Sequence, residues 1–170
     1  MRYMEIALVQ KTALRIKGKV ATFIVNPQTS AGADAVLLLD PVSEFLTEES
    51  VILRGAGEYE IGGVKITGMR NDKSVLYSMQ VDGMEIVVGT ITLLSAMQHK
   101  LKEHNIVVVN CEEITDASFL TSLGVNAVLF FGEKAQDVAE GFEKEKLQQI
   151  NKYSASLGKL PAEMETILLN

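Results

Sequence analysis

The stretch SVLYSMQVDGMEIVVG, residues 74–89, constrains the fold more strongly than any other segment. Apolar and polar residues alternate on both sides of Asp82-Gly83, as they do in strands that bury one face. Asp-Gly is favoured in type I′ turns because both central residues of such a turn need a positive φ. The stretch therefore predicts an antiparallel β-hairpin.

Further strands and turns are predicted in the first half of the chain. TALRIKGKVATFIVN alternates on both sides of Lys17-Gly18 and predicts a second hairpin. The adjacent glycines of Ile61-Gly62-Gly63-Val64 tolerate positive φ and predict a third tight turn. Residues 34–39 and 51–53 are short apolar runs that predict buried strands, whereas SEFLTEES is polar and predicts one helical turn with Ser43 as N-cap.

Helical spacing begins after the Asp82-Gly83 hairpin. Leu93, Leu94, Met97 and Leu101 recur three to four residues apart, which predicts an amphipathic helix capped by Thr92. These apolar positions give the helix one face to pack against a sheet.

The last third of the chain alternates strands with helices. An apolar strand at 106–109 precedes a helix that Asp116 caps and Gly124 ends, and a second apolar strand follows at 127–131. This order predicts a parallel crossover. Residues 134–150 predict a surface helix, and KYSASLG and ETILLN predict two closing strands. The expected fold class is α+β, a layered α/β sandwich that forms one domain over residues 1–170.

Composition excludes several classes of function. The net charge of −6 and the lack of a Lys/Arg cluster argue against a nucleic-acid partner. No apolar run reaches the roughly 20 residues that a membrane span needs, so no membrane association is expected and a cytoplasmic location is the default. The single cysteine, Cys111, follows an apolar run and has no basic neighbour in the sequence, so we expect a buried, unreactive thiol.

Standard catalytic motifs are absent from the sequence. GAGEYEIGG has Glu60 where a dinucleotide-binding loop needs glycine, and no G-x-S-x-G, H-E-x-x-H or C-x-x-C pattern occurs. His99 and His104 lie five residues apart, about 140° around a helix axis, and should not converge on one ion. Both are predicted to be solvated polar side chains near a helix end.

Carboxylates are the remaining candidates for chemistry. Asp40, Glu44, Glu58 and Glu60 would form a site for a hard cation if they met in space. Glu58 and Glu60 alternate along a strand and share a face, but a solvated acidic face gives the same pattern.

The order of motifs resembles the metallo-β-lactamase fold, in its branch of short Zn-dependent hydrolases. The most specific segment is RGAGEYEIGGVKITGM, which is similar to the family's G-P-G-E-Y-E-x-x-G-x-x-I-x-G pattern. In the opening hairpin, Asn26 stands before Pro27 where the family has aspartate. The other matching segments are LRIKGKVATFIVNP, ADAVLLLDPVSEF, VLYSMQVDGMEIVVGTI, LGVNAVLFFGE and GKLPAEMETILLN. The resemblance implies a truncated αββα fold with mostly antiparallel sheets.

The metal-ligand positions that this resemblance implies are degenerate. The family's H-x-H-x-D-H loop falls on Asp40, Val42, Glu44 and Phe45, the bridging aspartate on Thr90 and the final histidine on Gly132. Val and Phe cannot ligate, and Asp40 with Glu44 offers too few groups for zinc. We therefore expect no bound metal, no cofactor and no catalytic residue, with Val42 and Phe45 filling the vacated space as added core.

The resulting functional prediction is a metal-free pseudoenzyme that acts as a structural or protein-interaction module. A homo-oligomer or a protein partner would then occupy its broad sheet surface. Two alternatives remain. One is a divergent metal-dependent hydrolase with a carboxylate site at Asp40, Glu44 and Glu58. The other is a small-molecule-binding protein that uses the old active-site cleft.

Overall fold

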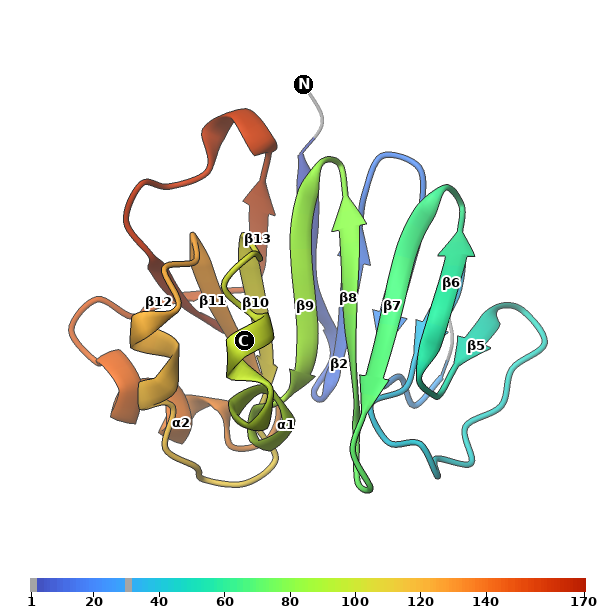
Figure 1. Cartoon of the computed structure of the whole chain (residues 1–170), viewed down its shortest axis with the longest axis horizontal. Helices are drawn as coiled ribbons and strands as arrows, with labels where there is room; N and C mark the ends of the chain where they lie inside the picture. Colours follow the sequence, from blue (N-terminus) through green and yellow to red (C-terminus); the bar gives the residue numbers. More distant parts are fainter. Residues whose placement is uncertain (1–2, 30–31) are drawn as a thin grey trace.

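Fourteen strands of the described chain form two sheets (Figure 1). The computed structural model describes residues 3–29 and 32–170. In spatial order the first sheet contains β13 (Lys152–Ala155), β1 (Met4–Gln10), β2 (Ala13–Lys17), β3 (Thr22–Val25), β4 (Ala35–Leu37) and β5 (Val51–Leu53). The second contains β12 (Gln148–Ile150), β14 (Glu165–Leu169), β11 (Ala127–Phe131), β10 (Ile106–Asn110), β9 (Met84–Thr90), β8 (Val75–Val81), β7 (Val64–Arg70) and β6 (Gly57–Ile61).

Strand pairing is evenly divided between the two directions. Six strand pairs of the described residues are antiparallel, and six are parallel. The expectation of mostly antiparallel sheets is therefore not confirmed. The predicted parallel crossover is present, because β10 pairs in parallel with both β9 and β11. The sequence located β4 and β5 as strands but not the direction in which they pair, and it missed the three-residue strand β12; the pairings of β3 with β4, β4 with β5 and β12 with β14 are all parallel.

The predicted hairpins have the expected turns. Asp82 and Gly83 take φ values of 51° and 84° between β8 and β9, as a type I′ turn requires. Gly62 and Gly63 take 56° and 82° between β6 and β7. The Lys17-Gly18 turn closes with a hydrogen bond from the Gly18 N–H to the Ala21 carbonyl, at 2.9 Å.

One apolar core lies between the sheets, and a second lies under the helices. The first contains buried side chains of both sheets, among them Phe23, Leu37, Tyr77 and Leu129. The second joins the opposite face of the eight-stranded sheet to the helical segments. These segments are α1 (Ile91–Ala96), η1 (Gln98–Lys100), η2 (Ser118–Ser122) and α2 (Ala135–Glu143); a further single turn, η3, spans Leu157–Lys159.

Several predicted helix limits are wrong. The cap of α1 is Thr90, whose hydroxyl accepts the Leu93 N–H, and not Thr92. The helix ends at Ala96, and the segment that Asp116 precedes forms only the 3₁₀ turn η2. Residues 43–50 form no helical turn. Residues 148–150 join the sheet as β12 in place of extending α2. None of the described helices is long and apolar enough to cross a lipid bilayer.

The two sheets are joined at one end by polar contacts. The Val75 N–H, at the start of β8, donates to the Leu39 carbonyl beyond β4 at 2.9 Å. The Tyr77 hydroxyl reaches through the core to the carbonyls of Leu38 and Leu53, at 3.0 and 2.9 Å. Burial raises the pKa of Tyr77 well above its ordinary value, so its hydroxyl stays protonated and able to donate. We call these contacts of Val75 and Tyr77 the inter-sheet clamp.

Tyr77→Phe should lower the free energy of unfolding by about 1–3 kcal/mol, because two buried carbonyls lose their shared donor while the packing volume is kept. Urea denaturation followed by circular dichroism measures this loss. Tyr153→Phe, at a buried tyrosine outside the clamp, is the matched control. A loss no larger than that of the control would contradict a stabilising role for the hydroxyl.

The same hydroxyl gives the clamp a pH dependence. The pKa of Tyr77 is higher in the folded chain than in the unfolded one. The contribution of its hydroxyl to the free energy of unfolding is therefore complete below a pH of about 10. Above that, the contribution falls as the pH rises toward the folded-state pKa. The difference in unfolding free energy between the wild type and Tyr77→Phe should therefore be constant from pH 7 to 9 and shrink at higher pH. If the difference in unfolding free energy between the wild type and Tyr77→Phe grows above pH 10, the pKa of Tyr77 is not raised by folding and this account of the clamp is contradicted.

Candidate functional site

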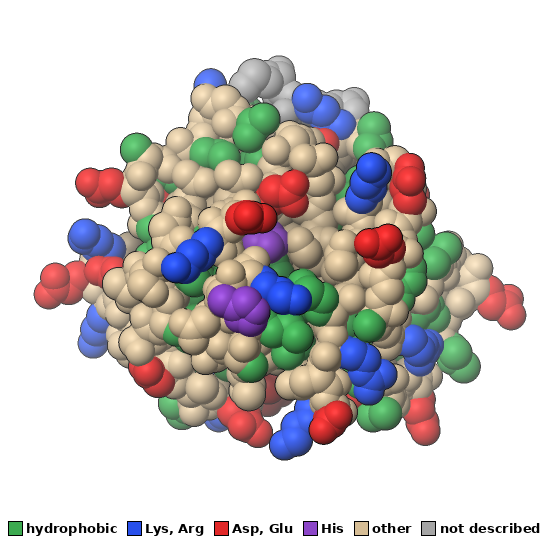
Figure 2. All heavy atoms as spheres, viewed as in Figure 1, with side chains coloured by type: hydrophobic (Ala, Val, Ile, Leu, Met, Phe, Trp, Pro, Cys, Tyr) green, Lys and Arg blue, Asp and Glu red, His purple; other side chains and the backbone are tan. Residues whose placement is uncertain are grey.

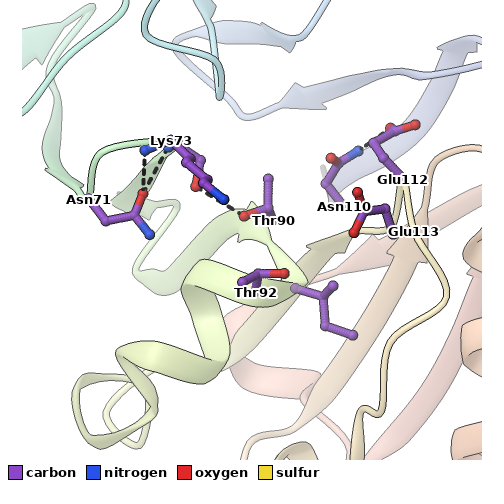
Figure 3. Close-up of a pocket in the computed structure, with 9 residues that line it drawn as sticks. Asn71, Lys73, Thr90, Thr92, Asn110, Glu112 and Glu113 are labelled. Atoms are coloured by element: carbon purple, nitrogen blue, oxygen red, sulfur yellow. Dashed lines mark hydrogen bonds between the residues drawn. The ribbon is translucent and has the colours of Figure 1, made fainter.

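A polar cleft lies where β9 and β10 end. Thr90 and Asn110, the last residues of these parallel strands, are directly paired in the sheet. The turn between β7 and β8 closes the cleft from the side, and the free volume is about 280 Å³. The cleft is lined by Asn71, Lys73, Ser74, Thr90, Ile91, Thr92, Asn110, Glu112 and Glu113 (Figure 3). Loops beyond the carboxyl ends of parallel strands are where α/β proteins usually place binding sites.

Two hydroxyls lie in the middle of the cleft. The Ser74 Oγ is 3.1 Å from the Thr90 Oγ1, and Ser74 is almost fully buried. Thr90 Oγ1 also accepts the Leu93 N–H at 3.3 Å. Because β8 and β9 are antiparallel neighbours, their register places Ser74, the residue before β8, beside Thr90 at the end of β9.

The β7–β8 turn presents Lys73 at the edge of the cleft. The Asn71 side-chain oxygen accepts the backbone N–H groups of Lys73 and Ser74, each at 2.9 Å. The Asn71 N–H in turn donates to the Ser74 carbonyl at 3.1 Å. This Asx-type arrangement fixes the turn backbone, while the Lys73 side chain remains exposed.

The opposite wall is acidic and closely packed. Buried Asn110 donates through Nδ2 to Glu112 Oε1 at 2.9 Å. Gly132 has a φ of 114°, and a Cβ added there would lie 2.6 Å from the Cys111 carbonyl oxygen and 3.0 Å from Glu112 Oε1. The absence of a side chain at Gly132 thus lets the loop that carries Glu112 and Glu113 lie against the end of β11.

The cleft therefore separates opposite charges across a row of neutral polar groups. Figure 3 shows Lys73 on one side, Glu112 and Glu113 on the other, and Thr90 and Thr92 between them. Such a site can bind a small molecule through hydrogen bonds and charge complementarity. The adjacent Cys111 takes no part, because burial and the charge of Glu112 raise the pKa of its thiol to about 12 and keep it protonated.

The loop predicted to hold degenerate ligands lies outside this cleft. Asp40 accepts the Val42 N–H at 2.9 Å in a local turn. The Val42 side chain is 80% exposed, so the expectation that it fills vacated space is wrong. Phe45 is half-buried, and the Arg54 guanidinium holds this loop by donating to the carbonyls of Ser43 and Phe45, at 2.6 and 2.9 Å. Glu44 is exposed.

The remaining predicted positions have different outcomes. Thr90 lines the cleft, and Gly132 supports its acidic wall. Glu58 and Glu60 face a separate hollow beside Lys65 on β6 and β7. Among residues 3–29 and 32–170, no three His, Cys, Asp or Glu side chains lie close enough together to hold a metal ion. The predicted carboxylate set is therefore not brought together.

Of the nine lining residues, Thr90 is the one that the sequence reasoning named as a site position. Asn110 ends the buried parallel strand β10, and Glu112 and Glu113 lie just beyond it, a position that by itself marks candidate binding residues. Asn71, Lys73 and Ser74 lie in or next to the β7–β8 turn, and the predicted hairpin about Asp82-Gly83 by itself brings Ser74 beside Thr90.

Solved structures with the same fold are metal enzymes by description. One is a proposed Zn-dependent hydrolase of the metallo-β-lactamase superfamily from Thermotoga maritima, with a TM-score of 0.70, 15% identity and 98% coverage of both chains. Another is CmlA, a diiron β-hydroxylase from Streptomyces venezuelae, with a TM-score of 0.58 and 8% identity. The match covers 92% of this chain and 55% of the hydroxylase. No protein-family model and no curated protein sequence matches the chain.

The chain therefore has the metallo-β-lactamase fold, which confirms the resemblance. The prediction of a catalytically silent structural module is wrong. Both neighbours are described as enzymes, and the cleft of this chain is open and lined by polar groups. The reasoning failed because it equated loss of the expected ligands with loss of the site.

The side chains of the cleft do not fit the metal cages that the fold implies. Zinc and iron sites use several imidazole, thiolate or carboxylate ligands on one ion. Here the cleft offers two carboxylates, and one of them, Glu112, already accepts a hydrogen bond from Asn110. The cleft therefore has the chemistry of a hydrogen-bonding site.

Gly132→Ala should destabilise the fold by roughly 1–3 kcal/mol, because its Cβ would meet backbone in a conformation that L-residues rarely adopt. Gly141→Ala is the matched control: it lies in α2 with open space around it and should stabilise by up to about 1 kcal/mol. Urea unfolding of both variants measures the two effects. Equal effects in both would show that the close approach at Gly132 is unimportant.

Proposed function

We propose that the protein binds a small polar molecule in the cleft between the β7–β8 turn and the ends of β9 and β10. The observation that supports this most directly is the placement of Lys73 opposite Glu112 and Glu113, with the hydroxyls of Ser74 and Thr90 between them. Loops beyond the carboxyl ends of parallel strands are common binding sites, and hydrogen bonds hold the side chains of Asn71, Ser74, Thr90, Asn110 and Glu112 here.

The charge arrangement favours a zwitterion. A carboxylate or similar anion would pair with the Lys73 ammonium, while an ammonium or hydroxyl group would donate to the carboxylates of Glu112 and Glu113. The volume of about 280 Å³ suits a molecule of amino-acid size. Thr90 and Thr92 add hydroxyls that orient such a ligand between the charged walls.

A second candidate is hydrolysis of the bound molecule in the same cleft. What favours it is that the hydrolase structure matches 98% of this chain and is described as Zn-dependent. The carboxylates of Glu112 and Glu113 are the groups in the cleft that would act as general base toward water. No metal-dependent step is assigned, since the donor set does not fit one.

Binding is tested by two-dimensional ¹H–¹⁵N NMR against zwitterions (glycine, serine, glutamine), an anion (lactate) and a dication (putrescine). We expect the zwitterions to shift the amide signals of residues 71–74, 90–92 and 110–113 more than the other two probes do. One-dimensional spectra with serine and glutamine esters and amides, recorded over a day, would reveal hydrolysis in the same cleft.

Variants then separate the two charged walls. Lys73→Ala and Glu112→Gln should each weaken binding at least tenfold, because each removes a charged partner. Lys65→Ala, at an exposed lysine in a different hollow, is the matched control and should bind as the wild type does. The proposal fails if every probe leaves the cleft signals unmoved, or if Lys65→Ala weakens binding as much as Lys73→Ala.

A further inference from the structure

We propose that Ser78 and His104 form a second reactive site, in which a histidine-activated serine attacks small carboxylic esters. The site lies on the helix-side face of the eight-stranded sheet, and its lining shares no residue with the cleft described above. It is independent of the proposed ligand-binding function.

The hydrogen bonds around His104 fix its protonation pattern. The Ser78 Oγ is 2.7 Å from His104 Nε2, and His104 Nδ1 is 3.2 Å from the Leu101 carbonyl oxygen. A carbonyl oxygen can only accept, so Nδ1 carries the proton of the neutral ring. Nε2 is then the acceptor, and the Ser78 hydroxyl donates to it. This is the arrangement by which a general base activates a serine nucleophile.

The surroundings keep the ring neutral. Burial lowers the pKa of His104 below its ordinary value, while the hydrogen bond to the Leu101 carbonyl and the charges of Glu85 and Glu103 oppose the shift. Neutral imidazole is therefore the dominant form at pH 7, ready to accept a proton. The other charged or titratable side chains facing this site are His99, Lys100 and Lys102.

An open hollow gives a substrate access to Ser78. It has a free volume of about 570 Å³ and is lined by Thr67 and Met69 on β7 and by the segment around η1. Figure 2 shows the two histidines of the chain on one face, next to lysine and apolar side chains. His99 and His104 both line this hollow, because the chain leaves the α-helix at Ala96. His99 is exposed, as predicted, whereas His104 is half-buried and hydrogen-bonded, so the prediction of a solvated side chain is wrong for His104 alone.

The lining indicates the substrate class. Met69, whose Sδ is 3.7 Å from Lys100 Nζ, offers an apolar contact for a short acyl chain. Lys100 and Lys102 outnumber the one acidic group of the lining, Glu103, and favour an ester that carries an anionic group.

The reaction is an acyl transfer to the enzyme and then to water. Ser78 Oγ forms a bond to the ester carbonyl carbon as its proton passes to His104 Nε2. The bond from that carbon to the leaving oxygen breaks, and the imidazolium returns the proton to the departing alcohol. Water then attacks the acyl-serine with His104 as base, which releases the carboxylic acid and restores Ser78.

Covalent labelling of the folded protein by a fluorophosphonate tests the site. Fluoride leaves as Ser78 Oγ bonds to phosphorus, and peptide mass spectrometry locates the label. We expect labelling at Ser78, a rate at least tenfold lower in Ser78→Ala, and a similar loss in His104→Gln, which keeps Ser78 and a hydrogen-bonding side chain. Ser154→Ala, at an exposed serine on β13, should be labelled as the wild type is.

The pH profile separates activation by His104 from a structural role. The labelling rate should rise with pH through a midpoint below 6.5 and level off above pH 7, because only the neutral ring accepts a proton. The proposal is overturned if Ser78 stays unlabelled while a known serine esterase in the same tube is labelled. It is also overturned if folded His104→Gln is labelled at the wild-type rate, or if the rate shows no such midpoint. Ligand binding at Lys73 and Glu112 is unaffected by any of these results.

Discussion

The inter-sheet clamp sets the geometry of everything at the cleft end of the molecule. An apolar core holds two sheets together but does not fix how far one slides over the other, because hydrophobic contacts are not directional. Two directional contacts fix the position of one sheet on the other. The Tyr77 hydroxyl contacts the carbonyls of Leu38 and Leu53, and the Val75 N–H donates to the carbonyl of Leu39, all at the ends of β4 and β5. A buried donor that loses its acceptor costs free energy of folding. The relative position of the two sheets that keeps these hydrogen bonds is therefore favoured.

The cleft follows from this constraint. The Val75 contact holds this end of β8 against the first sheet, and the β8–β9 register sets Ser74 against Thr90, with the Asn71 turn beside the ends of β9 and β10. On the other side, Gly132 allows the loop after β10 to lie close to β11, which places Glu112 opposite Lys73. The segment Asp40 to Phe45, where the resemblance puts the family's ligand positions, is a loop that makes its own turns and its own contacts with Arg54. The cleft is thus lined by polar groups of other segments, and no residue of 40–45 belongs to its lining.

Much of the fold could be predicted because it rests on local rules. The Asp82-Gly83 and Gly62-Gly63 turns need positive φ, and the strands at β5 and β11 were located to the residue from their apolar runs. The end of α1 and the strand β12 were missed, since tertiary packing decided both. The family resemblance singled out Thr90 as a degenerate ligand position, and Thr90 lines the cleft. Ser74 was not predicted there, although the β8–β9 hairpin register places it beside Thr90. The Ser78–His104 contact joins positions 26 residues apart, which no local pattern reveals.

The clamp can be observed directly through the amide of Val75. If the contact with the Leu39 carbonyl holds the two sheets together, the Val75 N–H can exchange with solvent only when the whole domain unfolds. In native-state hydrogen exchange, its opening free energy should equal that of the slowest amides of β9 and β10 and fall with urea at the same slope. If the opening free energy of the Val75 amide is instead much smaller and does not depend on urea, the sheets separate locally. That result would contradict the role of the clamp in holding the two sheets together.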